Sequence, residues 1–108
     1  MTAVDLATLD TPALLIDLDI VRGNLEGMQK KADECGVSLR PHVKTHKIPE
    51  LAHLQLSLGA VGITVAKASE AEVMAEAGIE DIFIANQVVS EIKLNRLAAL
   101  SKKKLTYQ

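Results

Sequence analysis

The stretch Gly59-Ala-Val-Gly-Ile-Thr-Val-Ala-Lys-Ala-Ser-Glu-Ala-Glu72 combines a short apolar segment with the start of a helix. Residues 61–66 are apolar and few, as expected for a parallel strand that is covered on both faces. Ser69 and Glu72 have the spacing of a capping box, which predicts a helix that Gly78 would end. The stretch therefore predicts one strand–helix unit of an α/β fold.

The same order recurs on both sides of this unit. The apolar positions of the first predicted helix fall three and four residues apart and form one face: Val21, Leu25, Met28, Ala32 and Cys35. Strands are expected at 13–18, 37–44, 81–85 and 105–107, and helices at 19–35, from Pro49 to Leu58, and from Ser90 onward. This alternation predicts parallel strands joined by crossover helices. An open doubly wound sheet and a (β/α)₈ barrel both fit it.

The composition is that of a globular protein. The chain has 108 residues, enough for one domain or for part of one. Hydrophobic residues make up 48% and charged residues 24%. Aromatic residues are only 2%, too few for a platform that stacks single-stranded nucleic acid, and the net charge of -2 provides no basic field for a phosphate backbone. Nucleic-acid binding is therefore not expected.

Cysteine content and hydropathy indicate the compartment. Cys35 is the only cysteine, so an internal disulfide and a cysteine-rich zinc site are excluded. No basic region followed by an apolar run marks a signal peptide, and no stretch approaches the length of a membrane span. A reduced, cytoplasmic setting without membrane contact is expected.

Polar residues follow three of the predicted strands. Lys44, Lys67 and Asn86 or Gln87 each lie where a strand gives way to its loop. Ligands of parallel α/β folds bind at the carboxyl ends of the strands. Any one of these residues is explained by a strand end that meets water. Three of them at similar spacing predict a functional rim.

The densest cluster of functional groups is Arg40-Pro-His-Val-Lys-Thr-His-Lys47. In a strand, Arg40, His42 and Lys44 would share one face and would need an anionic or covalently bound partner. A lysine amine is nucleophilic only when neutral, and neighbouring cations and burial favour that form. The cluster therefore predicts a Schiff-base lysine, Lys44, and an aldehyde cofactor that carries a phosphate. A solvated basic loop that binds nothing is the alternative.

A metal site is a rival interpretation of the two histidines in this run. His42 and His46 are four residues apart, the spacing of two ligands on one face of a helix. Pro41 and Val43 argue against a helix here, and no glutamate lies between the histidines. No metal ligand is therefore expected in this segment.

The run from Arg40 to Lys47 resembles the signature of the D-threonine aldolase and D-serine dehydratase group, which belongs to the alanine-racemase-like, fold type III pyridoxal-phosphate enzymes. Three other segments resemble the opening strand and the next two strand–helix units of that group, in the same order: residues 10–17, 59–72 and 77–88. The resemblance covers nearly the whole chain.

The resemblance implies an α/β fold made of parallel (β/α) units of a TIM-type (β/α)₈ barrel, here an incomplete barrel of about four strands. Residues 1–18 would be an opening strand that pairs with a missing C-terminal β domain, and residues 19–108 the N-terminal portion of the cofactor-binding barrel. By match to the motif, Lys44 would form the internal aldimine with pyridoxal 5'-phosphate. His42, Lys67 and Gln87 would lie near the cofactor or the substrate, while Arg40 could be a structural charge deeper in the barrel.

The activity that the resemblance implies is that of a lyase on a small D-amino acid. An aldolase would cleave a β-hydroxy-D-amino acid to glycine and an aldehyde, and this reaction is expected of the full-length enzyme but not of this chain alone. A D-serine dehydratase-like deaminase and a non-catalytic α/β interaction module are the alternatives. The family also implies a divalent metal whose ligands are not in this chain. A homo-oligomer, or association with the remainder of the enzyme, is expected.

Overall fold

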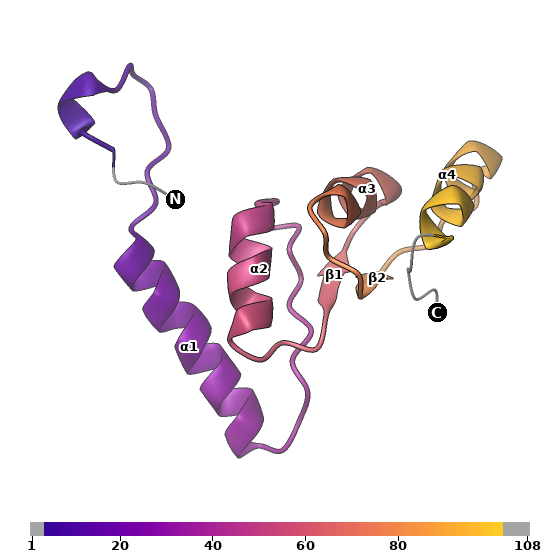
Figure 1. Ribbon diagram of the computed structural model, residues 1–108, viewed down its shortest axis with the longest axis horizontal. Coiled ribbons are helices and arrows are strands. Elements are labelled where there is room, and N and C mark those ends of the chain that lie inside the picture. Colours follow the sequence, from indigo (N-terminus) through magenta and orange to yellow (C-terminus); the bar gives the residue numbers. More distant parts are fainter. Residues whose placement is uncertain (1–3, 103–108) are drawn as a thin grey trace.

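The computed structural model describes residues 4–102, and Figure 1 shows helices alternating with two short strands along this part of the chain. The first element of this described part is a short 3-10 helix, and the last is a helix of eleven residues. The elements are η1 (Leu6–Thr8), α1 (Leu18–Glu34), α2 (Pro49–Ser57), β1 (Ile63–Val65), α3 (Ala68–Glu76), β2 (Ile82–Ile84) and α4 (Glu91–Ser101).

The strands β1 and β2 pair in parallel, with Ile63 opposite Ile82. A third extended segment runs beside β1 on its other edge. It joins β1 through one isolated bridge, from His42 to Thr64, and through the Val61 amide, which donates to the carbonyl oxygen of Leu39 at 3.0 Å. The three segments form a short parallel ladder, as the alternation predicts.

The predicted strand at 37–44 is reduced to this single bridge. Pro41 has no amide hydrogen and so cannot donate to the ladder, although its carbonyl accepts from the Thr64 amide at 2.8 Å. Beyond the bridge the chain turns, and the Lys47 amide donates to the Val43 carbonyl at 2.8 Å. The strand therefore ends before Lys44, which lies in the turn.

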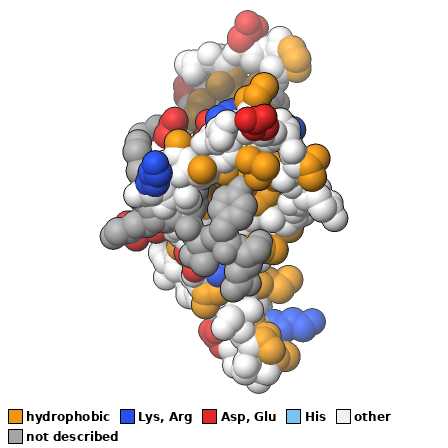
Figure 2. Space-filling view, turned by 90° about the vertical axis from the view of Figure 1, so that its right-hand side faces the viewer, with side chains coloured by type: hydrophobic (Ala, Val, Ile, Leu, Met, Phe, Trp, Pro, Cys, Tyr) orange, Lys and Arg blue, Asp and Glu red, His pale blue; other side chains and the backbone are white. Residues whose placement is uncertain are grey.

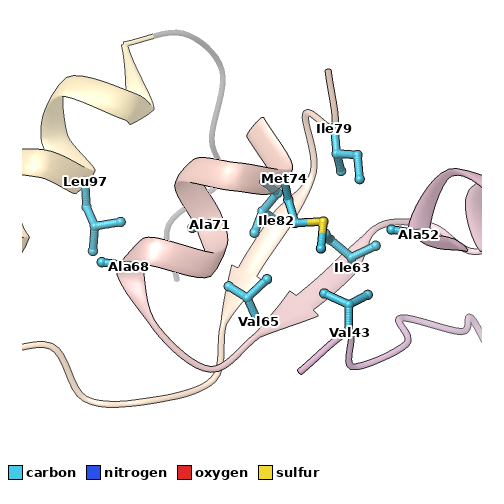
Figure 3. Close-up of a cluster of buried hydrophobic side chains, with 10 residues drawn as sticks. All are labelled: Val43, Ala52, Ile63, Val65, Ala68, Ala71, Met74, Ile79, Ile82 and Leu97. Carbon is cyan, nitrogen blue, oxygen red and sulfur yellow. The ribbon is translucent and has the colours of Figure 1, made fainter. Parts of the chain in front are cut away.

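One face of the ladder carries the hydrophobic core. Ile63 and Val65 are fully buried and point toward α3, while Thr64 between them faces the other side. Figure 3 shows these side chains meeting Met74 of α3. The cluster of buried residues is Val43, Ala52, Ile63, Val65, Ala68, Ala71, Met74, Ile79, Ile82 and Leu97. Full burial of one such large side chain contributes about 1.5–3 kcal/mol, so this cluster is the main source of stability.

The helix α1 confirms the predicted helical segment but begins earlier than predicted. Asp17, not Asp19, is its N-cap, and its carboxylate accepts from the Asp19 amide at 3.0 Å and from the Ile20 amide at 3.1 Å. Of the predicted apolar face only Ala32 is buried, while Met28 is 55% exposed. This helix contributes little to the core.

The predicted opening strand at 13–18 does not form. Residues 13–17 carry no regular secondary structure, and Leu18 already belongs to α1. Leu14 is 92% exposed, and Figure 1 shows this segment extending away from the ladder. A strand needs a neighbour for its backbone hydrogen bonds, and no neighbour lies beside this segment in the described part of the chain. The predicted strand at 105–107 lies outside the described residues.

The capping box predicted for α3 is wrong. The helix begins at Ala68 with Lys67 as its N-cap, and no side chain caps it there. Glu70, at the third helical position, accepts instead from the Ala66 amide at 2.7 Å. Ser90 does occupy the N-cap of α4, but its hydroxyl makes no capping hydrogen bond.

Figure 2 shows lysine, arginine and acidic side chains scattered among hydrophobic ones on the face that it presents. None of the helices in residues 4–102 has the length and hydropathy that crossing a membrane requires.

Candidate active site

The two ends of the ladder hold different sets of residues. Arg40, Gly62 and Asp81 precede the paired residues of the three segments and so lie at the amino end. Lys44, Lys67 and Gln87 follow the paired residues and lie at the carboxyl end. Because the carboxyl end of a parallel ladder is where α/β folds bind ligands, the second set defines the candidate site.

At the amino end, Arg40 and Asp81 form a two-pronged ion pair. The Nη1 and Nη2 atoms of Arg40 lie 2.7 Å and 3.1 Å from the two carboxylate oxygens of Asp81. The hydrogen bond to Asp81 raises the pKa of Arg40 above its ordinary value. Gly62 leaves the space for this pair, since a Cβ there would overlap the guanidinium and lie 2.8 Å from Asp81 Cγ. Arg40 is thus a structural charge, which is one of the two interpretations of this residue, and its partner is Asp81 rather than a ligand shared with Lys44.

Lys44 lies at the carboxyl end, in the turn formed by residues 43–46. The Lys44 side chain is exposed to solvent and not buried, contrary to the expectation from the sequence. Its backbone amide donates to Nδ1 of His42 at 3.3 Å. No acidic side chain among residues 4–102 forms an ion pair with Lys44. The Lys44 amine is therefore accessible to a ligand from solvent.

The backbone hydrogen bonds of this turn set the tautomers of the two histidines. His42 accepts at Nδ1 from Lys44, so its neutral ring carries the proton on Nε2. His46 accepts at Nδ1 from the Ile48 amide at 2.9 Å, and its Nε2 then donates to Oε1 of Gln55 at 3.2 Å. His46 is thereby a structural link from the turn to α2. Residues 4–102 contain no group of three or more side chains arranged to hold a metal ion.

The ends of β1 and β2 bring Lys67 and Gln87 together. Both line a small cavity of about 120 Å³ with Asn86 and Lys93. The side-chain amide of Asn86 donates to the carbonyl oxygen of Ala66 at 3.3 Å, and the backbone amide of Gln87 donates to Asn86 Oδ1 at 2.9 Å. Lys44 and His42 do not line this cavity, so they lie at the same end of the ladder but not in the same pocket.

Glu70 is a residue of this region that sequence reasoning missed. Its side chain is only 8% exposed, and Nζ of Lys47 lies 3.4 Å from its Oε1. Burial alone would raise the pKa of Glu70, but the Ala66 amide and the Lys47 ammonium outweigh burial and lower it below its ordinary value. The sequence signal that could have identified Glu70 is an acidic residue in the first turn of a helix, where its side chain can accept from a free backbone amide that precedes the helix.

A second cavity separates the Lys44 turn from α3. It has a volume of about 250 Å³ and is lined by residues of the turn and of the first two turns of the helix: Val43, Lys47, Lys67, Ser69, Glu70, Val73 and Met74. Lys67 lines both cavities. The donor set at the carboxyl end consists of an exposed amine, an imidazole, cationic groups and amides. This set fits an aldehyde that carries a phosphate, since an amine binds the carbonyl and cations bind the anion.

Comparisons with known proteins place the chain among a defined group. The family described as "Alanine racemase, N-terminal domain" matches residues 16–106. The chain is 50% identical over 97 residues to a D-threonine aldolase of Arthrobacter sp, covering 90% of this chain and 26% of the relative. It is 51% identical over 80 residues to a D-threo-3-hydroxyaspartate dehydratase of Delftia sp. (strain HT23), covering 74% of this chain and 21% of the relative.

Solved structures agree with these relatives. The D-threonine aldolase from Filomicrobium marinum superposes with a TM-score of 0.90 at 48% identity, covering 94% of this chain and 28% of that one. The D-threo-3-hydroxyaspartate dehydratase from Delftia sp. HT23 superposes with a TM-score of 0.82 at 44% identity, covering 89% and 25%. The chain spans about a quarter of the length of the relatives that it matches.

Proposed function

Because this chain belongs to the alanine racemase N-terminal domain family, we propose that it is part of a pyridoxal-phosphate-dependent lyase whose cofactor is held covalently by Lys44. The fold expectation is confirmed: the parallel ladder and its helices are an incomplete portion of a TIM-type barrel. The observation that carries the proposal is the position of Lys44, exposed in a turn directly after the carboxyl end of the ladder.

The proposed roles follow from what each side chain presents. Lys44 offers an amine that is exposed and without an acidic partner among the described residues. His42 holds the Lys44 backbone through Nδ1 and leaves Nε2–H for a ligand beside the amine. Lys67 and Gln87 offer an ammonium and an amide from the next two strand ends, which suits a carboxylate or phosphate. When bound, the cofactor supplies a ring that stabilises negative charge on the substrate Cα.

The substrate class follows from the relatives taken together. Their names specify D-threonine, D-threo-3-hydroxyaspartate, 3-hydroxy-D-aspartate and D-serine. All four are D-amino acids that carry a β-hydroxyl group. We therefore propose a β-hydroxy-D-amino acid as the substrate of the enzyme to which this chain belongs.

Retro-aldol cleavage to glycine and an aldehyde is the reaction we favour, because a D-threonine aldolase is 50% identical over 90% of this chain. Dehydration and deamination form the second candidate, since a dehydratase is 51% identical over 74% of the chain. Both reactions would use the same lysine, so the residues at this end of the ladder serve either one. The divalent metal that the resemblance implies receives no ligand from residues 4–102 in this proposal.

Absorption spectroscopy tests the role of Lys44. The purified chain is mixed with pyridoxal 5'-phosphate and passed through a gel-filtration column, and the visible band of lysine-bound cofactor is recorded. Lys44→Ala is expected to abolish the band. Lys31→Ala is the matched control, because it removes an exposed lysine of α1 to which the proposal gives no role, and it is expected to keep the band.

Two outcomes would contradict the proposal. Bands of equal strength in the wild type and in Lys44→Ala would mean that surface lysines react without selection. Absence of a band in the wild type would favour the non-catalytic α/β module over a cofactor-binding unit.

A further inference from the structure

Glu70 joins three parts of the candidate site through one buried carboxylate. Its backbone belongs to the first turn of α3. Its Oε2 accepts from the Ala66 amide at 2.7 Å, directly after β1. Its Oε1 faces the Lys47 ammonium at 3.4 Å, and Lys47 ends the turn that carries Lys44. The carboxylate is thus the point at which helix, strand and turn meet.

The backbone of Lys47 shows that this turn is constrained. Lys47 has a φ of 56°, in the left-handed region that side chains other than glycine seldom adopt. Such a conformation persists only where the surrounding contacts fix it, and it is concentrated at functional sites. The contacts that involve Lys47 are its backbone hydrogen bond to Val43 and its ion pair with Glu70, and the His46 side chain holds the turn from its other side.

We propose that Glu70 is a positioning residue that, through Lys47, holds the 43–47 turn and so fixes where the Lys44 amine is presented. The proposal rests on the role assigned to Lys44 under the proposed function. Glu70 itself need not touch substrate or cofactor. Its effect reaches Lys44 because the turn links the two residues over three peptide bonds between Lys44 and Lys47.

A purely structural explanation is that Glu70 only satisfies the free amide at the start of α3. That task needs the hydrogen bond from Ala66 and not the ion pair with Lys47. Glutamine at this position separates the two tasks, since its amide oxygen can accept from Ala66 but carries no charge for Lys47. Glu70→Gln therefore preserves the hydrogen bond at the helix start and removes only the ion pair with Lys47.

Four variants make the test specific. Glu70→Gln and Lys47→Met each remove one side of the ion pair, while Lys47→Arg retains the charge and is expected to behave like the wild type. Glu72→Gln is the matched control, because Glu72 lies on the same helix and pairs with Arg96 of α4, away from the turn. In the Glu70→Gln background, Lys47→Met should add no further effect if the two residues act as a pair.

The first readout is amide hydrogen exchange and needs no cofactor. In the purified chain, Glu70→Gln and Lys47→Met are expected to accelerate exchange of the Lys47 amide, which donates to Val43, by about two- to fivefold. Amides of α4 should keep their wild-type rates. Unchanged exchange of the Lys47 amide in both variants would overturn the proposal whatever Lys44 binds.

The second readout is covalent capture of pyridoxal 5'-phosphate. The Lys44 amine adds to the aldehyde and one water leaves as the carbon–nitrogen double bond forms. Borohydride then delivers a hydride to that carbon and solvent protonates the nitrogen. Peptide mapping gives the ratio of labelled Lys44 to labelled Lys31, an exposed lysine of α1, in one sample, and Glu70→Gln is expected to lower this ratio about two- to fivefold.

The labelling ratio distinguishes a failure of the positioning role of Glu70 from a failure of the cofactor-binding role of Lys44. A wild-type chain that labels Lys44 no faster than Lys31 would remove the assignment of Lys44, and exchange would still decide whether Glu70 holds the turn. A wild type that prefers Lys44, with the same preference in Glu70→Gln, would leave the function standing and overturn the positioning role.

Discussion

Each end of the short ladder carries a basic residue, but the two residues differ in whether an acidic side chain pairs with them. At the amino end, Arg40 is satisfied by both oxygens of Asp81. At the carboxyl end, Lys44 is exposed and forms no ion pair within the described residues. The difference comes from the neighbouring side chain and not from the residue type. Asp81 lies beside Arg40 at the amino end, and no acidic side chain of the described residues pairs with Lys44 at the carboxyl end. A paired cation stabilises the fold, whereas an exposed cation without an ion pair is available to a ligand.

The largest expected effect comes from filling the space at the amino end. Gly62→Ala would place a methyl group 2.8 Å from Asp81 Cγ and against the Arg40 guanidinium. We expect the free energy of unfolding to fall by about 3 kcal/mol, through overpacking and loss of the ion pair. Urea denaturation measures this change.

Gly23→Ala is the control for that substitution. Gly23 lies in α1, and no atom lies within 4 Å of its missing Cβ. Alanine should therefore raise the free energy of unfolding by roughly 0.5–1 kcal/mol through helix propensity. A Gly62→Ala protein as stable as the wild type would mean that the close approach of Arg40 to Gly62 is not required.

A smaller effect is expected when the ion pair is broken without overpacking. Asp81→Ala leaves the half-buried Arg40 without its bidentate partner. The expected loss is about 1–2 kcal/mol, less than for a fully buried pair because solvent screens both side chains. In thermal unfolding, Arg22→Ala should change stability by less than about 0.5 kcal/mol, because the Arg22–Glu26 pair lies on an exposed helix surface.

Asp81→Ala also sharpens the comparison between the two ends. If the amino end is purely structural, the folded variant should still bind pyridoxal 5'-phosphate at Lys44 in the absorption assay. Loss of the band in a variant that remains folded would contradict the division of roles between the two ends.

The smallest effect concerns pH at the carboxyl end. The pKa of Glu70 is lowered in the folded chain, because the Ala66 amide and Lys47 outweigh the opposing effect of burial. A lowered folded-state pKa contributes stability above the unfolded-state value and loses it as the pH falls through the folded-state value. The stability difference between the wild type and Glu70→Gln should therefore be present at neutral pH and shrink below the ordinary value of 4.5.

Urea denaturation of both proteins at a series of pH values measures that difference. We expect it to stay below about 1 kcal/mol even at neutral pH, because the Lys47 side chain is largely exposed. A difference that grows on acidification would have the wrong sign for a carboxylate of lowered pKa and would contradict the described ion pair.

From residue 49 to residue 101 the sequence predicted the order of the helices and strands correctly. The apolar segments at 61–66 and 81–85 contain β1 and β2, and Pro49 begins α2 as expected for a residue without an amide hydrogen. Membership of the predicted family is confirmed over residues 16–106. The roles of Lys44, His42, Lys67 and Gln87 remain predictions, which rest on their motif and on their position at the carboxyl end.

The sequence by itself determined the α/β alternation, the family and the candidate lysine, because periodicity and motif spacing are local properties of the chain. Only the tertiary structure decided that Arg40 pairs with Asp81, which lies 41 residues away, and that Glu70 rather than Glu72 reaches the free amide at α3. It also decided that residues 13–17 form no strand. The physical reason is common to all three. Each depends on which groups lie side by side after folding, because an ion pair or a strand pair forms only when both partners are in place.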